Sequence, residues 1–347
     1  MIKILTATDK KALNAGPKAK LDIVTILKNV YGKEIKEETV NIIDKSREGK
    51  KNNIFDKFYN FFSAFKLIIK NINYKGIIII QYPFIKNIFI RLLPKKKTII
   101  IIHDLMGIRN LNLKLEKEEI KTLKKFKYIV AHNKKMHKYL NDKGIESSIV
   151  ELQLFDYLCT ENCNKEIEER NFLNVAYVGN LKKTKAPFIY QLDDKMNYYL
   201  NLYGNGIEKE KIKNNKIVYH GAFQPDELPN IINSDIGLVW DGKIDELDEN
   251  EGAKNYTKYN NPHKLSCYIA ANIPVIVWSK SAIADFVKKN ELGYCINNLN
   301  EINNINLKDI ESKKKNLKEI SDKVKNGYYT INAIEEIVNK IEEEGDK

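Results

Sequence analysis

Short apolar runs alternate with longer amphipathic segments through the first half of the chain. The runs at 77–81 and 99–103 are continuous and rich in isoleucine, as a parallel strand covered by helices on both faces requires. Segments 18–31 and 55–72 instead carry apolar residues at helical spacing. One face of the second segment collects Phe58, Phe61, Phe62, Phe65 and Ile69. This alternation predicts a doubly wound α/β domain.

The same alternation restarts after a polar, acidic segment at 160–171. We expect further strands at 174–178, 198–203, 216–219, 236–240 and 274–277, and helices at 225–234 and 263–271. Residues 309–347 are mostly helical by periodicity, with an interruption near Gly327. We therefore predict three parts, with the last packing back on the first. They are an N-terminal Rossmann-like domain over 1–160, a C-terminal one over 170–320, and a helix over 321–347.

Ligands of parallel sheets bind outside the carboxyl ends of the strands, so the residues that follow each strand carry the candidate chemistry. In the first half, Gly16 enters a helix and can bring backbone N–H groups to an anion. His103 and Asp104 close the strand at 99–102, where a carboxylate could take the proton of a sugar hydroxyl. Both patterns also suit ordinary structure, because Asn-Ala-Gly-Pro is a common loop and Asp104 could cap the next element.

The loop that opens the second half combines a glycine turn with lysines. Gly179 and Asn180 end the first strand there, and Lys182, Lys183 and Lys185 follow. Tyr203-Gly204 ends the next strand in a similar way. A lysine ammonium in a sheltered site strongly offsets the charge of a diphosphate. A solvated lysine cluster is the alternative interpretation.

Lys264 stands in the first turn of the helix predicted at 263–271, directly after His263. The helix dipole disfavours a cation at that end unless an anion lies beside it. A ligand anion explains the placement, and simple exposure explains it less specifically. Ser266, Cys267, Ala270 and Ala271 are small enough for this helix to approach other backbones closely.

Composition narrows the class of protein. The net charge of +12, from 58 basic and 46 acidic residues, permits affinity for phosphate-bearing partners or a charged membrane surface. The lysines are scattered among acids and no nucleic-acid-reading motif accompanies them, so we expect no nucleic-acid partner. Cys159 and Cys163 have no matching downstream pair, so we expect no metal site. The chain shows neither a signal-peptide pattern nor a long apolar span, which favours a cytoplasmic location.

The order of motifs in the second half resembles the nucleotide-binding domain of GT-B glycosyltransferases. It runs from Gly179-Asn180 through Tyr203-Gly204 and His220-Gly221 to Lys264 and the segment 270–277. More narrowly it is similar to bacterial β-1,6-galactofuranosyltransferases and to the accessory glucosyltransferases that extend O-glycans on serine-rich adhesins. Segment 14–20 and His103-Asp104 fit the first domain of that group. The resemblance covers nearly the whole chain.

The resemblance implies a UDP-sugar donor held by the second domain and a glycan, glycoprotein or lipid-linked acceptor on the first. No metal ion or other cofactor is required. The expected catalytic residues are Asp104, Lys183 and Lys264, with Asp104 preferred over Asp9 as the base if the reaction inverts configuration. A retaining reaction needs no such base. The expected donor-binding residues are Gly16, Gly179, Asn180, Lys182, Lys183, Tyr203, Gly204, His263 and Lys264.

The chain departs from the wider pattern at two positions. Many GT-B enzymes place a ribose-binding glutamate where Cys267 stands, and a glycine where Asn272 stands, so ribose recognition must come from other residues. A relative within the group that this chain resembles also carries arginine where Lys182 and Lys183 follow the Gly-Asn turn.

Two other functions compete with a transferase. A UDP-sugar epimerase shares the architecture, and so does a non-catalytic partner subunit of a transferase. The resemblance mildly favours a homo-oligomer. Contact with the inner face of the membrane would suit a lipid-linked acceptor, although we expect Phe58, Phe61 and Phe62 to lie in the core rather than to serve as an anchor.

Overall fold

The computed structural model describes residues 1–8, 15–44, 51–159, 172–244 and 252–345. The chain forms two compact units. Unit 1 comprises Met1–Leu13, Ile23–Leu152 and Thr330–Lys347, and unit 2 comprises Asn14–Asp22 and Gln153–Tyr329. The boundary predicted at 160–170 falls on residues outside the described ranges.

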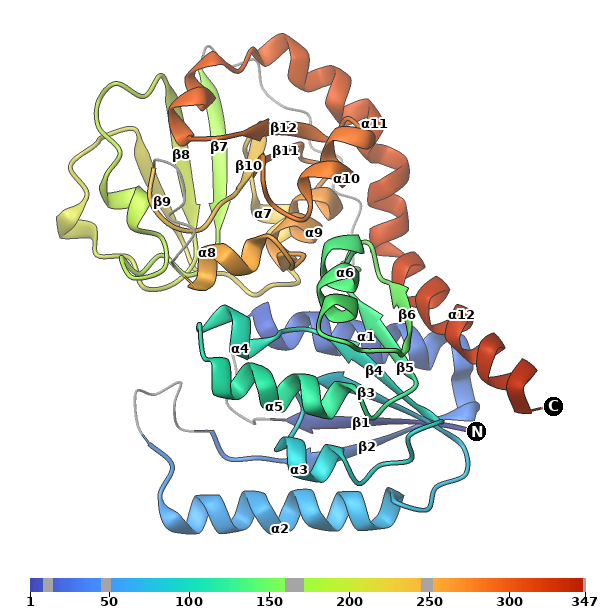
Figure 1. Ribbon diagram of the computed structural model, residues 1–347. Helices are drawn as coiled ribbons and strands as arrows, with labels where there is room; N and C mark the ends of the chain where they lie inside the picture. Colours follow the sequence, from blue (N-terminus) through green and yellow to red (C-terminus); the bar gives the residue numbers. More distant parts are fainter. Residues whose placement is uncertain (9–14, 45–50, 160–171, 245–251, 346–347) are drawn as a thin grey trace. The chain divides into compact units, whose positions relative to one another are not determined.

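Unit 1 is built on a six-stranded sheet in the order β2-β1-β3-β4-β5-β6, and every neighbouring pair is parallel (Figure 1). Its strands are β1 (Ile2–Thr8), β2 (Ile35–Asn41), β3 (Ile77–Tyr82), β4 (Thr98–Ile102), β5 (Tyr128–Ala131) and β6 (Ser148–Glu151). All residues of β4 and β5 are buried. The isoleucine runs therefore form the central strands, because only residues covered on both faces can be apolar throughout.

Helices connect these parallel strands in sequence. They are α1 (Ala15–Tyr31), α2 (Ile54–Asn71), α3 (Asn87–Ile90), α4 (Met106–Arg109), α5 (Leu113–Leu123) and α6 (Lys134–Asp142). Asn53 and Asp56 form a capping box that starts α2, because each side chain accepts a hydrogen bond from the other residue's backbone N–H. The helix packs against β2 and α3 (Figure 1).

Unit 2 repeats the architecture with a second parallel sheet, in the order β12-β11-β10-β7-β8-β9. Its strands are β7 (Leu173–Val178), β8 (Tyr198–Tyr203), β9 (Ile217–Gly221), β10 (Ile236–Val239), β11 (Val275–Trp278) and β12 (Gly293–Ile296). Its helices are α7 (Leu228–Ile231), α8 (Gly252–Thr257), α9 (His263–Ala270), α10 (Ala284–Lys289) and α11 (Leu307–Lys325). Two parallel α/β sheets confirm the predicted fold class.

The last part of the chain is helical and interrupted, as predicted. α11 ends at Lys325, Gly327 adopts a φ of +77°, and α12 (Tyr328–Gly345) follows. A positive φ at the residue after a helix is the usual glycine stop. The end of α12 is attached to unit 1, because the Tyr128 hydroxyl donates a 2.8 Å hydrogen bond to the Glu344 carboxylate.

Three sequence expectations are wrong in detail. The helix expected over 225–234 is only the single turn of α7. The edge strands β2 and β12 were not predicted. The aromatic residues of α2 are not core: Phe58, Phe61 and Phe62 are 56%, 41% and 62% exposed, because α2 buries a different face that contains Ala64, Leu67 and Ile68.

Within the described residues, no helix has both the length and the apolar character needed to cross a bilayer.

Candidate functional site

Two glycines end the neighbouring strands β7 and β8 and pack backbone against backbone. Gly179 N–H donates a 3.0 Å hydrogen bond to the Tyr203 carbonyl, and the two glycines have φ values of +145° and +148°. A Cβ atom on Gly204 would lie 1.8 Å from the Gly179 carbonyl oxygen. The pairing of these two turns therefore requires glycine at 204, for space as well as for backbone conformation.

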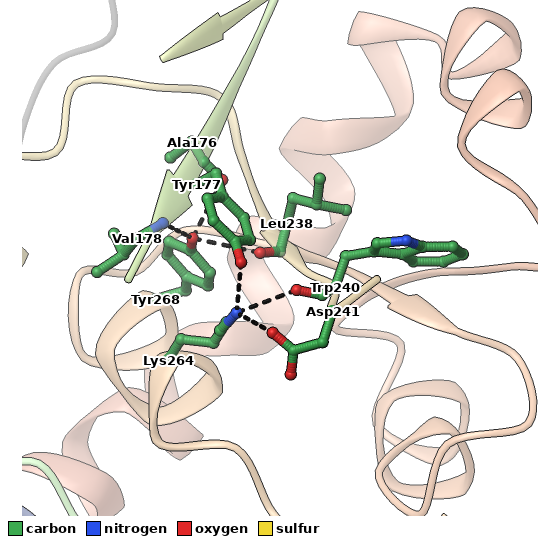
Figure 2. A network of polar contacts seen from close by, with 8 residues as sticks. All are labelled: Ala176, Tyr177, Val178, Leu238, Trp240, Asp241, Lys264 and Tyr268. Carbon is green, nitrogen blue, oxygen red and sulfur yellow. Dashed lines mark hydrogen bonds and ion pairs between the residues drawn. The ribbon is translucent and has the colours of Figure 1, made fainter. Parts of the chain in front are cut away.

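Lys264 brings its ammonium to the same end of the sheet from the first turn of α9. Its Nζ donates to the Tyr177 hydroxyl at 3.2 Å, the Trp240 carbonyl at 3.1 Å and Asp241 Oδ1 at 3.1 Å (Figure 2). The Nζ also lies 4.4 Å from the centroid of the Tyr177 ring. Burial alone would lower the pKa of Lys264, but Asp241 and Tyr177 outweigh it and hold that pKa above its usual value. The site therefore contains a fixed positive charge.

Tyr268 holds α9 in place, one helical turn after Lys264. Its hydroxyl accepts a 2.8 Å hydrogen bond from Val178 N–H and lies 3.1 Å from the Ala176 carbonyl (Figure 2). A Cβ atom on Gly237 would lie 2.3 Å from the Tyr268 ring. The absence of a side chain at 237 thus lets the ring of Tyr268 lie against β10. Because residues four apart share a helix face, this contact also sets the position of Lys264.

The ammonium lies directly beside the Gly179 turn. A Cβ atom placed on Gly179 would have Lys264 Nζ, at 4.0 Å, as its nearest contact outside the adjoining residues. The glycine thus leaves backbone accessible next to a buried cation. A turn without a side chain beside a lysine leaves room for a phosphate group to approach the ammonium.

The lysines that follow Gly179 lie at the surface. Lys182 and Lys183 are exposed, and Asn180 Oδ1 accepts a 3.0 Å hydrogen bond from Lys182 N–H, which shapes the turn. Lys183 is near Glu208: together with the stronger partner Lys211, it holds the pKa of that carboxyl below its usual value. Lys182 and Lys183 are therefore surface charges, unlike Lys264.

Two expected donor-binding residues turn their side chains into unit 2. The Tyr203 ring is 2% exposed and stacks on His220 with the ring centroids 4.8 Å apart. The His263 ring stacks on Tyr157, also at 4.8 Å. Burial, reinforced by the charge of Lys18, lowers the pKa of His263 to about 3, so its imidazole is neutral. Both rings therefore pack against ring neighbours within unit 2.

Asp241 is the functional candidate that sequence reasoning missed. It follows β10 and Trp240, so the rule that strand ends carry the chemistry could have found it. Cys267, which stands at the usual ribose-binding position, is buried beside the Tyr157 hydroxyl, and burial raises the pKa of its thiol to about 12. A neutral, buried thiol cannot take the place of the ribose-binding glutamate carboxylate. The Asp241 carboxylate, by contrast, is 39% exposed.

In unit 1, Asp104 follows β4 as expected. Its Oδ1 accepts a 2.8 Å hydrogen bond from Arg109 Nη1, and the preceding His103 pairs with Gln81 at 2.7 Å. Nearby Glu119 is buried and accepts hydrogen bonds from the backbone N–H groups of Met106 and Gly107. Burial, aided by the charge of Asp104, raises the pKa of Glu119 to about 7 despite those hydrogen bonds.

The structure describes only part of the loop in which Asp9 and Gly16 were predicted. Asp9 lies outside the described residues, and Gly16 stands in the first turn of α1, where the surrounding side chains are also outside them. One turn into that helix, Lys18 is buried in unit 2. Its Nζ lies 2.6 Å from both Asp22 Oδ1 and Asp226 Oδ1. Within the described ranges, no group of three or more metal-ligating side chains occurs.

The fold has close counterparts among solved structures. The Anabaena protein HepE, solved in complex with UDP, superposes with a TM-score of 0.60 at 10% identity, with 99% of each chain covered. At that identity the likeness concerns the fold. Two parallel α/β units, with a cationic strand-end site in the second, are the architecture of the GT-B fold.

Sequence relatives identify the family. Residues 2–154 match the N-terminal domain of the glucosyltransferase 3-like family, and residues 175–337 match its C-terminal domain. The chain therefore belongs to the glucosyltransferase 3-like family. It is 29% identical over 280 residues to the β-1,6-galactofuranosyltransferase WbbI of Escherichia coli K12, covering 77% of this chain and 80% of the relative. Glucosyltransferase 3 of Streptococcus gordonii is 28% identical over 141 residues, 38% of this chain and 41% of the relative.

Proposed function

We propose that the protein transfers a hexosyl unit, galactofuranose or glucose, from a UDP-sugar to a sugar hydroxyl of a growing glycan. The acceptor is a glycan, a glycoprotein or a lipid-linked saccharide. Support comes from the names of its relatives, a galactofuranosyltransferase and a glucosyltransferase, and from a fold counterpart that was solved with UDP.

The observation that carries the proposal is the position of the Lys264 ammonium beside the Gly179 turn. In the proposed complex, the donor diphosphate lies against that turn, where the positive charge of the Lys264 ammonium attracts its oxygens. As the glycosidic bond to the donor breaks, negative charge grows on the departing UDP. A cation already fixed by Tyr177, Trp240 and Asp241 stabilises that charge without reorganising.

The same lysine would replace a divalent cation. Lys264 supplies the buried charge, and the surface ammonium groups of Lys182 and Lys183 can move onto the outer phosphate oxygens. A phosphate-bound metal ion is then unnecessary. Full activity after treatment with EDTA is the expected result. Loss of activity in EDTA, restored by Mg²⁺ or Mn²⁺, would contradict this part of the proposal.

Asp104 is our choice of base for an inverting reaction. Its carboxylate follows a buried strand and is oriented by Arg109, so it could accept the proton of the attacking hydroxyl. Under an inverting mechanism, Asp104→Asn should lower turnover by about 100-fold while leaving donor affinity unchanged. Product configuration determined by NMR decides whether this role is needed, since a retaining reaction does not use such a base.

The decisive experiment is a product assay with UDP-galactofuranose and UDP-glucose, each with and without a saccharide acceptor. A transferase yields a new glycosidic product only when acceptor is present, and mass spectrometry detects it. An isomerised nucleotide sugar formed without acceptor would instead identify an epimerase. Absence of both products, together with no thermal shift on adding UDP, would support a non-catalytic subunit and overturn the proposal.

A further inference from the structure

α2 presents an aromatic surface to solvent, which we call the aromatic face and define as Phe55, Phe58, Tyr59, Phe61, Phe62 and Phe65. Each of these side chains is between 40% and 79% exposed. Exposed aromatic side chains are unremarkable singly, but six on one helix form a continuous apolar patch of the kind that marks an interaction site.

Four of the six rings, those of Phe58, Phe61, Phe62 and Phe65, form a connected cluster. Phe58 and Phe62 stack with centroids 6.5 Å apart, and Phe61 meets Phe62 edge to face at 5.6 Å. Phe61 also contacts the buried Phe89 of α3 at 5.0 Å. This contact links the aromatic face to the core of unit 1 and holds it in a defined shape.

The opposite face of α2 already provides the packing that the helix needs. Ala64, Leu67 and Ile68 are buried there, and the capping box at Asn53 and Asp56 starts the helix. Phe61 and Phe65 add contacts to Phe89, but the exposed parts of the aromatic face are not required to hold α2 against unit 1. Their exposed surface lowers solubility, which calls for an occupant of the patch.

Charge indicates what that occupant is. At about 3.6 residues per turn, Lys66 and Lys70 follow one border of the aromatic face and Lys57 follows the other. All three lysines are exposed, although Lys70 already forms a 3.1 Å ion pair with Glu38 of β2. The only acidic residue in the sequence of α2 is Asp56, which is buried. A helix with aromatic side chains on one face, lysines along its borders and no exposed acid is complementary to an anionic lipid surface.

We propose that α2 docks unit 1 on an anionic lipid bilayer, with its rings at the level of the acyl-chain boundary and its lysines among the headgroups. The helix would lie in the plane of the interface, because its lysines and its buried face do not permit insertion across the bilayer. The protein's net charge of +12 adds a long-range attraction in the same direction. This inference goes beyond the transferase reaction and does not depend on it.

The test is flotation of the full-length protein with lipid vesicles. The wild-type protein should float with vesicles of phosphatidylcholine containing about one third phosphatidylglycerol, and not with phosphatidylcholine alone. Phe58→Ser combined with Phe62→Ser should reduce the bound fraction by about 10-fold or more. Lys57→Glu combined with Lys66→Glu should reduce it comparably, and salt at about 0.5 M should weaken wild-type binding.

A matched control removes two exposed apolar side chains elsewhere. Leu113 of α5 and Phe172, ahead of β7, are 71% and 53% exposed. The double variant Leu113→Ser and Phe172→Ser should float like the wild type. Circular dichroism should show unchanged helix content in every variant, because all the substituted side chains are exposed.

Two results would overturn the proposal. One is wild-type protein that floats with neither type of vesicle. The other is an oligomer, measured by light scattering, that dissociates when Phe58 and Phe62 are replaced while vesicle binding is unaffected. The second result would mean that another copy of the chain covers the aromatic face. Activity on a soluble acceptor, measured in parallel, tests the transferase function separately from vesicle binding.

Discussion

The Nζ atom of Lys264 lies 3.1 Å from Oδ1 of Asp241, so the buried ammonium already has an anionic partner within unit 2. The sequence placed a cation where the helix dipole disfavours it, and this carboxylate explains how the folded protein tolerates the placement. Lys264 is 14% exposed and Asp241 is 39% exposed. A ligand phosphate could approach the ammonium from the side where the carboxylate meets solvent, and share the cation with it.

Replacing Lys264 with alanine should lower turnover with a UDP-sugar by about 100-fold or more, because the fixed charge that stabilises the leaving diphosphate is lost. Steady-state kinetics measure the effect. Lys216→Ala is the matched control: Lys216 Nζ also donates to a backbone carbonyl, that of Met196, but it stands just before β9, at the opposite end of the strands. Equal activity of the Lys264 variant and the control would remove Lys264 from the site.

Asp241→Asn should leave the cation without its charged partner. We expect a loss of about 1 kcal/mol in unfolding free energy, since the carboxylate is more than one-third exposed. UDP should bind more tightly to Asp241→Asn than to the wild type, because its diphosphate no longer competes with a carboxylate for the Lys264 ammonium. Calorimetric titration with UDP measures this affinity. Binding as weak as that of Lys264→Ala would show instead that Asp241 itself holds the donor.

Gly204→Ala and Gly179→Ala should differ sharply in stability. Both positions have strongly positive φ, but a methyl group on Gly204 would lie 1.8 Å from a backbone oxygen, whereas one on Gly179 would only approach Lys264 Nζ at 4.0 Å. We expect Gly204→Ala to lose about 3 kcal/mol or more, or to fail to fold. Gly179→Ala should fold and bind UDP less tightly. Thermal unfolding with and without UDP compares the two, and similar melting temperatures for them would contradict the packing described here.

Acid should destabilise unit 1 through His132. Burial lowers the pKa of His132 to about 4, although its Nε2 lies 3.0 Å from the Ile102 carbonyl. Below pH 6.5 the unfolded chain takes up a proton that the folded protein does not, so the stability present above pH 6.5 is lost as the pH falls toward 4. Between pH 7 and 5 this group accounts for about 2 kcal/mol. Urea unfolding should show a flatter pH dependence in His132→Gln, and an unchanged slope would contradict the assignment.

The strands that the sequence predicted best are the buried ones. Tyr198–Tyr203 has the predicted bounds and Ile77–Tyr82 ends one residue later than predicted, because a strand covered on both faces has a continuous apolar sequence. The strands that escaped prediction, β2 and β12, are the edge strands at one end of each sheet. Their residues alternate between buried and exposed positions or are only half-buried, so their composition resembles that of a loop.

The candidate site was predicted in part. The glycine turns at 179 and 204 and the basic residue at 264 were visible as strand-end and helix-start signals. The contact between Gly204 and Gly179, and the carboxylate of Asp241 beside Lys264, join residues that are 25 and 23 positions apart. No local pattern contains such pairs, since they depend on which strands are neighbours in the sheet.

By itself, the sequence determined the alternation of strands and helices, the two α/β units and the family, because buried strands and strand-end glycines impose local restrictions on residue type. Only the tertiary structure decided which lysine is a fixed cation and which are surface charges. It also decided that the phenylalanines of α2 face solvent. Helical periodicity shows that residues share a face, but what covers that face depends on the packing of the whole unit.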